Sequence, residues 1–204
     1  MKKLLAVAVM AVTMISSTFA LNLSVGVKGL AGANVGTNIV ENAQKISSDT
    51  AFIYGAGAYI DFSIFGPAGF QIGANFSNNE VTTDDGSFTN YLLDVPVMLW
   101  ADFKIGPVGI GAGGGLNLSF VVDSISKDSV VSSVTSNVFN YGITAGANAK
   151  FYPKKFFAIV AGATYVLDIS PTKITPASVV SGEPLLTFNR GILSGNLGVE
   201  FKLF

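Results

Sequence analysis

The sequence of 204 residues contains no cysteine and no histidine, and only 12% of its residues are charged. Without cysteine, the chain forms no disulfide and offers no thiolate for covalent chemistry or lipid attachment. A soluble domain usually carries about twice this charged fraction. The net charge is −1, so nothing in the charge balance favours nucleic acid as a partner.

Long hydrophobic runs are also missing after residue 20, although 50% of the residues are hydrophobic. The best candidate, Phe156 to Leu167, is followed by Asp168 and is shorter than the roughly 18 residues that a membrane-spanning helix needs. Lipid accommodates only helices and closed barrels, because backbone polar groups must be satisfied internally. An apolar chain without such a helix therefore predicts a membrane β-barrel.

The first twenty residues have the features of an export signal. Lys2 and Lys3 precede an apolar core from Leu4 to Ile15, and small residues lead to Ala20. We expect residues 1–20 to be a signal peptide cleaved after Ala20, and residues 21–204 to be the barrel. An uncleaved anchor is the alternative, which the short apolar core disfavours.

The remaining chain alternates with a period of two, as strands with two different faces do. The segments that show this pattern are 21–33, 51–65, 68–77, 90–105, 108–122, 137–152, 156–169 and 189–204. The prediction is an all-β fold: an eight-stranded antiparallel up-and-down transmembrane β-barrel.

The connections between these segments alternate between long and short. The long ones, rich in Ser, Thr, Asn and Asp, are 34–50, 78–89, 123–136 and 170–188, and the short ones are 66–67, 106–107 and 153–155. Outer-membrane barrels have long extracellular loops and short periplasmic turns. An even strand number then places both termini in the periplasm. Outward aromatic residues gather near both strand ends, with alanines midway, which predicts two aromatic girdles around a plain apolar band.

Two tempting motifs have ordinary explanations. The run from Gly109 to Gly114 matches G-x-G-x-x-G, but it leads into another alternating strand and not into the helix that nucleotide binding requires. We expect its inward glycines to make room for Met98 and Trp100 inside a narrow barrel. Asp84-Asp85-Gly86 lacks the remaining ligands of a calcium loop and suits a hairpin tip. No cofactor and no metal site is expected.

Charged residues at inward positions suggest a network inside the barrel. Five of each sign are expected there and, because isolated buried charges are costly, we expect them to pair and close the lumen. A catalytic or proton-conducting constellation is the alternative, but nothing in the spacing of Asp94 and Asp102 calls for acid–base work. With the neighbouring indole, the expected lumen residues are Lys28, Asp61, Asp94, Trp100, Asp102, Lys104, Lys150, Asp168, Arg190, Glu200 and Lys202.

The segment Tyr91–Leu99, followed by the glycine-rich Gly106–Gly113, resembles the outer membrane protein beta-barrel domain family, and the whole pattern is similar to small barrels of the OmpA and OmpX type. The resemblance implies a location in the bacterial outer membrane, contact with its lipids, and insertion by the barrel-assembly machinery, which recognises a C-terminal aromatic residue. Phe204 supplies that residue, although Leu203 and not Phe204 continues the outward phase of the last strand.

The resemblance carries no shared active site. Outer-membrane barrels that are lipases, proteases or lipid A-modifying enzymes use histidine as a general base, and this chain has none. We therefore expect a non-enzymatic barrel with a structural or surface-interaction role, binding any extracellular ligand through its long loops. The alternative is passive, porin-like transport of small or hydrophobic solutes.

Overall fold

The computed structural model describes residues 22–35, 38–41, 44–47, 52–65, 67–83, 86–126, 134–136, 139–176 and 186–203. The expected signal peptide and Phe204 lie outside these residues. Within them, no helix is long and apolar enough to cross a membrane.

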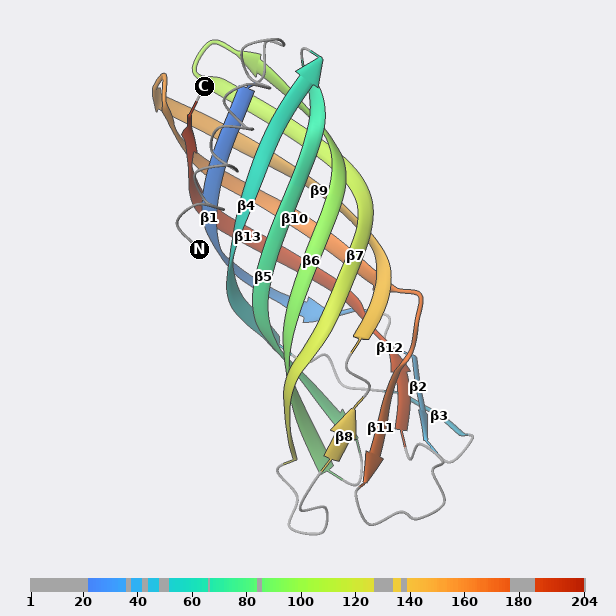
Figure 1. Cartoon of the computed structure of the whole chain (residues 1–204). Coiled ribbons are helices and arrows are strands. Elements are labelled where there is room, and N and C mark those ends of the chain that lie inside the picture. Colours follow the sequence, from blue (N-terminus) through green and yellow to red (C-terminus); the bar gives the residue numbers. More distant parts are fainter. Residues whose placement is uncertain are drawn as a thin grey trace, which may run out of the picture.

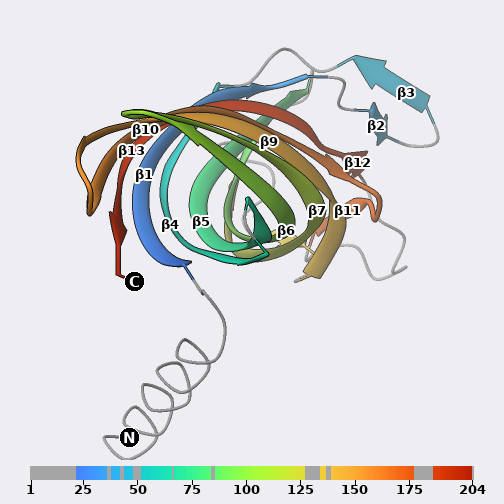
Figure 2. The ribbon, with the colours of Figure 1, turned by 90° about the horizontal axis from the view of Figure 1, so that it is seen from above.

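Eight strands form a closed antiparallel barrel, as predicted, in the order β1-β13-β10-β9-β7-β6-β5-β4. Figure 1 shows the barrel from the side, and Figure 2 looks along its axis. The barrel closes where β1 pairs with β13 on one side, placing Val25 opposite Phe201, and with β4 on the other, placing Val25 opposite Ile60. The strands are β1 (Asn22–Asn34), β4 (Phe52–Phe65), β5 (Ala68–Thr83), β6 (Gly86–Ile105), β7 (Val108–Ser126), β9 (Phe139–Lys154), β10 (Phe157–Asp168) and β13 (Gly191–Lys202).

The two ends of the barrel differ. Short turns after β4, β6 and β9 lie at the end that also holds the start of β1 and the end of β13; we call this the turn end. The turn after β6 contains Gly106 with φ of 61°, a conformation that favours glycine because it has no Cβ. The opposite end, which carries the remaining connections, is called the loop end.

The loop end contains more strand than expected. Residues 78–89 were predicted to form a long loop, but β5 continues to Thr83 and β6 begins at Gly86, and these two residues pair with each other. Similarly, β7 continues to Ser126. These segments are rich in polar residues, so hydrophobic alternation gives little sign of strands that extend beyond the apolar wall.

A second sheet at the loop end was not predicted. Its five strands come from segments expected to be loops (34–50, 123–136 and 170–188), and they pair in the order β3-β2-β12-β11-β8. Figure 1 shows them beyond the barrel mouth, far from the turn end. These strands are β2 (Asn38–Glu41), β3 (Gln44–Ser47), β8 (Val134–Ser136), β11 (Thr172–Pro176) and β12 (Leu186–Asn189).

The outer wall of the barrel is apolar, and the inner wall is mostly polar. Along β9, Ala145, Ala147 and Ala149 are exposed, whereas Thr144 and Lys150 are buried. Exposed aromatic rings lie towards both strand ends, as predicted: Phe52, Tyr54, Phe76, Phe139, Tyr141 and Tyr165 towards the loop end, and Phe103, Phe151, Phe156 and Phe201 towards the turn end. Such a wall suits lipid, because an apolar belt with aromatic edges matches a hydrocarbon core between two headgroup layers.

Candidate functional site

The lumen is the candidate site, because most of the buried polar side chains point into it. Trp100 and Met98 occupy its middle and are buried. Trp100 on β6 lies opposite Gly113 on β7, and a Cβ on Gly113 would overlap the indole ring and the Leu99 carbonyl oxygen. The glycines of β7 therefore make room for Trp100, as the sequence predicted.

A first ion cluster, the turn-end cluster, centres on Lys150 of β9. Its Nζ lies 3.1 Å from Asp61 Oδ2, 2.8 Å from Asp102 Oδ2 and 2.8 Å from Glu200 Oε2. The hydroxyl of Tyr59 donates to Glu200 Oε2 at 2.9 Å. These carboxylates come from β4, β6 and β13, so one ammonium group links three other strands across the lumen.

A second ion cluster, the loop-end cluster, centres on Arg190, which directly precedes β13 and is 1% exposed. Its Nε and Nη2 both donate to Asp168, the latter at 2.9 Å, forming a bidentate pair. Nη2 also donates to Ser119 Oγ at 2.7 Å and lies 3.5 Å from Asp94 Oδ1. Asn117 donates to Asp94 at 2.9 Å. The cluster thus joins β10 and β13 to β6 and β7.

Between the two clusters the lumen narrows to small voids. Cavities of about 20 Å³ and 30 Å³ lie there, and Lys28 lines both. Each volume is close to that of a single water molecule. Lys28 lies 5.7 Å from the centre of the Tyr59 ring, and no ion pair of the described residues includes it. Side chains therefore fill most of the space between the two clusters.

The structure brings together most, but not all, of the expected lumen residues. Asp61, Asp94, Asp102, Lys150, Asp168, Arg190 and Glu200 form the two clusters, and Lys28 and Trp100 lie between them. Lys104 and Lys202 are instead exposed at the turn end. Their inward phase was inferred correctly, but they stand at strand ends where water reaches them. The interior therefore holds three cations and five carboxylates, and the expected balance of five against five is wrong.

Sequence reasoning missed two neutral partners of the loop-end cluster. Ser119 and Asn117 complete that cluster. Their inward phase was visible in the alternation, but neutral side chains give no charge signal. Within the described residues, no group of carboxylates is arranged to hold a metal ion.

No protein-family model and no curated protein matches the chain. Solved structures do. The outer membrane protein OprG from Pseudomonas aeruginosa aligns with a TM-score of 0.69 at 14% identity, over 89% of this chain and 96% of that one. The chain has the fold of the small outer-membrane β-barrels. Neisserial surface protein A has this fold as well, with a TM-score of 0.53 at 14% identity, over 89% of this chain and 96% of that one. Like them, this barrel has the apolar outer wall of an outer-membrane protein.

The same barrel fold also includes an enzyme. The outer membrane enzyme PagL aligns with a TM-score of 0.50 at 12% identity, over 84% of this chain and 97% of that one. The fold therefore does not separate enzymes from other barrels.

Proposed function

We propose that this outer-membrane barrel has a structural or surface-interaction role, and that its lumen is closed by side chains. The observation that carries the proposal is the pair of ion clusters, in which Lys150 and Arg190 each reach across the lumen to several other strands. An eight-stranded barrel is only about wide enough for its own side chains. Removing one partner of a buried ion pair is costly, because it leaves a buried charge uncompensated, so these clusters favour a lumen that stays closed.

The loop-end sheet supports the interaction role. Its five strands lie beyond the apolar wall, together with the extensions of β5, β6 and β7. Loops of this kind carry the functions of many proteins, because a rigid scaffold positions them. We propose that the loop end faces the exterior and binds an extracellular partner, and that residues 1–20 act as the export signal and the barrel-assembly machinery inserts the chain.

The proposed orientation can be tested by labelling single cysteines on intact cells, because the chain has no cysteine of its own. Thr135→Cys lies on β8 at the loop end, and Lys155→Cys lies in the turn between β9 and β10. A membrane-impermeant maleimide should label the first and not the second. Both variants should fractionate with outer membranes and migrate differently on gels before and after boiling. Labelling of Lys155→Cys alone, or recovery as a soluble periplasmic protein, would contradict the proposal.

Passive transport of small solutes is the second candidate. It is favoured by buried polar atoms that have no hydrogen-bond partner in the protein, including Asn75 Oδ1, Thr144 Oγ1 and Asn148 Oδ1. Atoms of this kind are usually partnered by water. Transport would use such waters if they form a continuous hydrated path through the lumen. Liposomes that contain the barrel and swell rapidly in small sugars would favour transport over a closed lumen.

A further inference from the structure

The turn end carries a cluster of lysines, which we call the lysine rim: Lys104, Lys154, Lys155 and Lys202. All four are exposed, and none takes part in an ion pair of the described residues. The carboxylates nearest this end are Asp61, Asp102 and Glu200, and Lys150 engages all three. Among the described residues, this end therefore holds five cations, Lys150 and the four rim lysines, against three carboxylates, and its balance is positive.

The lysine rim follows the edge of the barrel at the turn end. Lys104 Nζ lies 3.8 Å from the centre of the Tyr152 ring, and Lys154 Nζ lies 5.9 Å from that of Phe156. The backbone N–H of Lys202 donates to the Phe156 carbonyl at 2.9 Å. The rim thus follows β6, the turn between β9 and β10, and the end of β13. Its lysines stand next to exposed Phe103, Phe156 and Phe201, the level at which aromatic rings and lysines meet lipid headgroups.

The charge of the loop end is the reverse. The segments 34–50, 78–89, 123–136 and 170–188 contain eight carboxylates (Glu41, Asp49, Glu80, Asp84, Asp85, Asp123, Asp128 and Glu183) and three lysines (Lys45, Lys127 and Lys173). The two ends therefore differ mainly in their carboxylates, which outnumber the lysines in the loop segments by eight to three. All four lysines of the rim are exposed.

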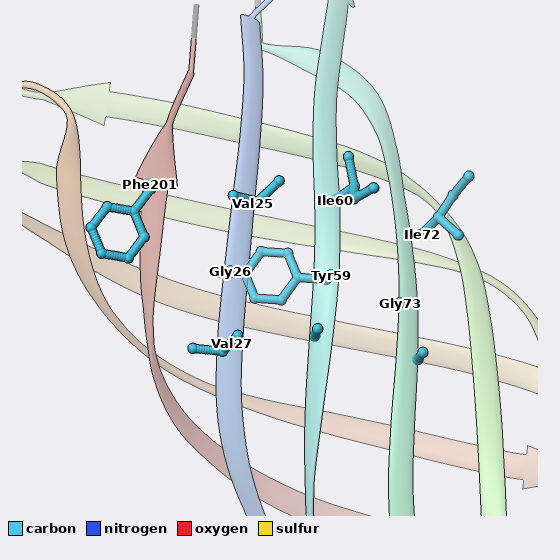
Figure 3. A pocket seen from close by; sticks show the side chains of 10 residues that line it. Val25, Gly26, Val27, Tyr59, Ile60, Ile72, Gly73 and Phe201 are labelled. Carbon is cyan, nitrogen blue, oxygen red and sulfur yellow. The ribbon is translucent and has the colours of Figure 1, made fainter. Parts of the chain in front are cut away.

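An apolar groove of about 420 Å³ opens on the outer wall beside the lysine rim. Figure 3 shows the side chains around it, with Phe201, Val25, Ile60 and Ile72 on neighbouring strands. The register places these four in one row across the wall. The next outward row, towards the loop end, contains Ala58 and Ala74, which also line the groove. Small side chains behind a row of large ones produce the hollow.

Two glycines form part of the floor of the groove. Gly26 and Gly73 line it, and the Tyr59 ring lies directly inside Gly26, where a Cβ would overlap it. The Cβ of a residue at position 73 would lie 3.0 Å from Pro96 Cγ. Glycine at these positions lets inner side chains pack directly against the backbone and support the wall from inside. The outer face of the wall stays hollow.

From these observations we propose that the lysine rim and the groove together bind one anionic phospholipid of the adjoining leaflet. The headgroup phosphate contacts the rim through Lys154 and Lys155, whose turn leads into β10, where Phe157 pairs with Phe201 at the groove, and one acyl chain lies in the groove. Lys202 directly follows Phe201, and three residues of strand span about 10 Å from Lys202 to the Ala58 row. One leaflet supplies an acyl layer of about 15 Å, half of the hydrocarbon core, so a chain that starts at the rim reaches the groove. The inference rests on the proposed insertion of the barrel with its turn end at a phospholipid leaflet.

The test is native mass spectrometry of the refolded mature chain in neutral detergent, with equal amounts of phosphatidylglycerol and phosphatidylethanolamine. The wild type should retain phosphatidylglycerol in preference. In the variant K104Q/K154Q/K155Q/K202Q that preference should fall by about ten-fold or more, because each lysine near an anionic surface contributes severalfold. The matched control K45Q/K173Q, with substitutions on β3 and β11, should keep it.

The groove is tested separately by Ala74→Phe, which fills the hollow, with Ala112→Phe as a control on the exposed wall of β7. Ala74→Phe should reduce the retention of both lipids, and Ala112→Phe should reduce neither. A wild type without preference for phosphatidylglycerol, or a glutamine variant that retains the preference, would overturn the proposal. Equal lipid retention by Ala74→Phe and the wild type would overturn the proposal that the groove holds an acyl chain. Boiled and unboiled gel samples report folding for every variant. A wild type that does not fold contradicts the proposed function, whereas a folded barrel without lipid preference contradicts only this site.

Discussion

Lys150 shows how a single residue can hold a barrel interior together. Its ammonium group lies within 3.1 Å of three carboxylates from three other strands. Replacing it with methionine keeps most of the length of the side chain but leaves those carboxylates facing one another inside the lumen. We expect Lys150→Met to lower the free energy of unfolding by about 3–5 kcal/mol, the usual effect of breaking a buried ion pair.

Lys155→Met is the matched control for that experiment, because Lys155 is exposed and makes no ion pair in the described structure. Its effect should stay within about 0.5 kcal/mol, as for most surface substitutions. Urea unfolding of both variants in the same detergent measures the difference. Similar unfolding midpoints would show that the turn-end cluster contributes little.

Gly113 is a second residue whose role is specific, because the structure leaves no space for a Cβ at this position. A Cβ at this position would overlap the Leu99 carbonyl oxygen and the Trp100 ring, neither of which is the end of a flexible chain. Gly113→Ala should therefore destabilise the barrel by about 1–3 kcal/mol through overpacking.

Gly29 offers a matched comparison for Gly113, since it also lies in a strand, but its Cβ would have only the Leu197 carbonyl oxygen nearby, at 4.0 Å. Gly29→Ala should be neutral or slightly stabilising, because alanine restricts the unfolded chain more than glycine does. Thermal unfolding of the two variants distinguishes them. Equal losses would mean that Trp100 does not occupy the space above Gly113.

At the scale of the strands, the exposure of Ala147 on β9 marks the middle of the lipid-facing belt. Arginine at a mid-membrane outward position should cost about 2–4 kcal/mol, and arginine near an interface about 0–1 kcal/mol. Ala147→Arg should therefore destabilise the barrel in phospholipid vesicles much more than Ile105→Arg, whose site is 80% exposed beside a turn. The reverse order of stabilities would mean that the belt is wrongly placed along the strands.

Strand faces could be predicted from sequence because alternation is a local property. A shift of one residue exchanges the two faces, and the alternation along β9 placed Ala147 and Thr144 on the correct sides. The depth of a residue along the barrel axis, in contrast, is not a local property of the sequence. Lys104 and Lys202 share the inward phase of Lys150, but only the position of each strand end shows that they reach water.

The loop-end sheet could not be predicted for a related reason. Its strands are three to five residues long and pair across large sequence separations, as where β12 joins β2. Short polar strands carry no hydrophobic pattern, and their pairing depends on the barrel bringing distant loops together. The partners of the ion clusters were similarly hidden, since each cluster draws residues from four or more separate elements.

For the whole molecule, the charge pattern and the wall describe a barrel with two distinct surfaces. Four exposed lysines lie at the turn end, carboxylates predominate in the loop segments, and the apolar belt lies between them. Long-range charge of this kind affects association and orientation more than it affects the fold. Most charges of the lumen instead meet one another in the two clusters.

The closed lumen is the central claim, and single-channel conductance in planar bilayers tests it most directly. The refolded wild type should show little or no steady conductance, because the two clusters cross the lumen and the side chains between them line cavities of about 20 Å³ and 30 Å³. The double variant Lys150→Ala with Arg190→Ala removes both bridging cations and should show more frequent or larger openings. Steady wild-type current at the level of a water-filled pore, unchanged in the double variant, would contradict the account.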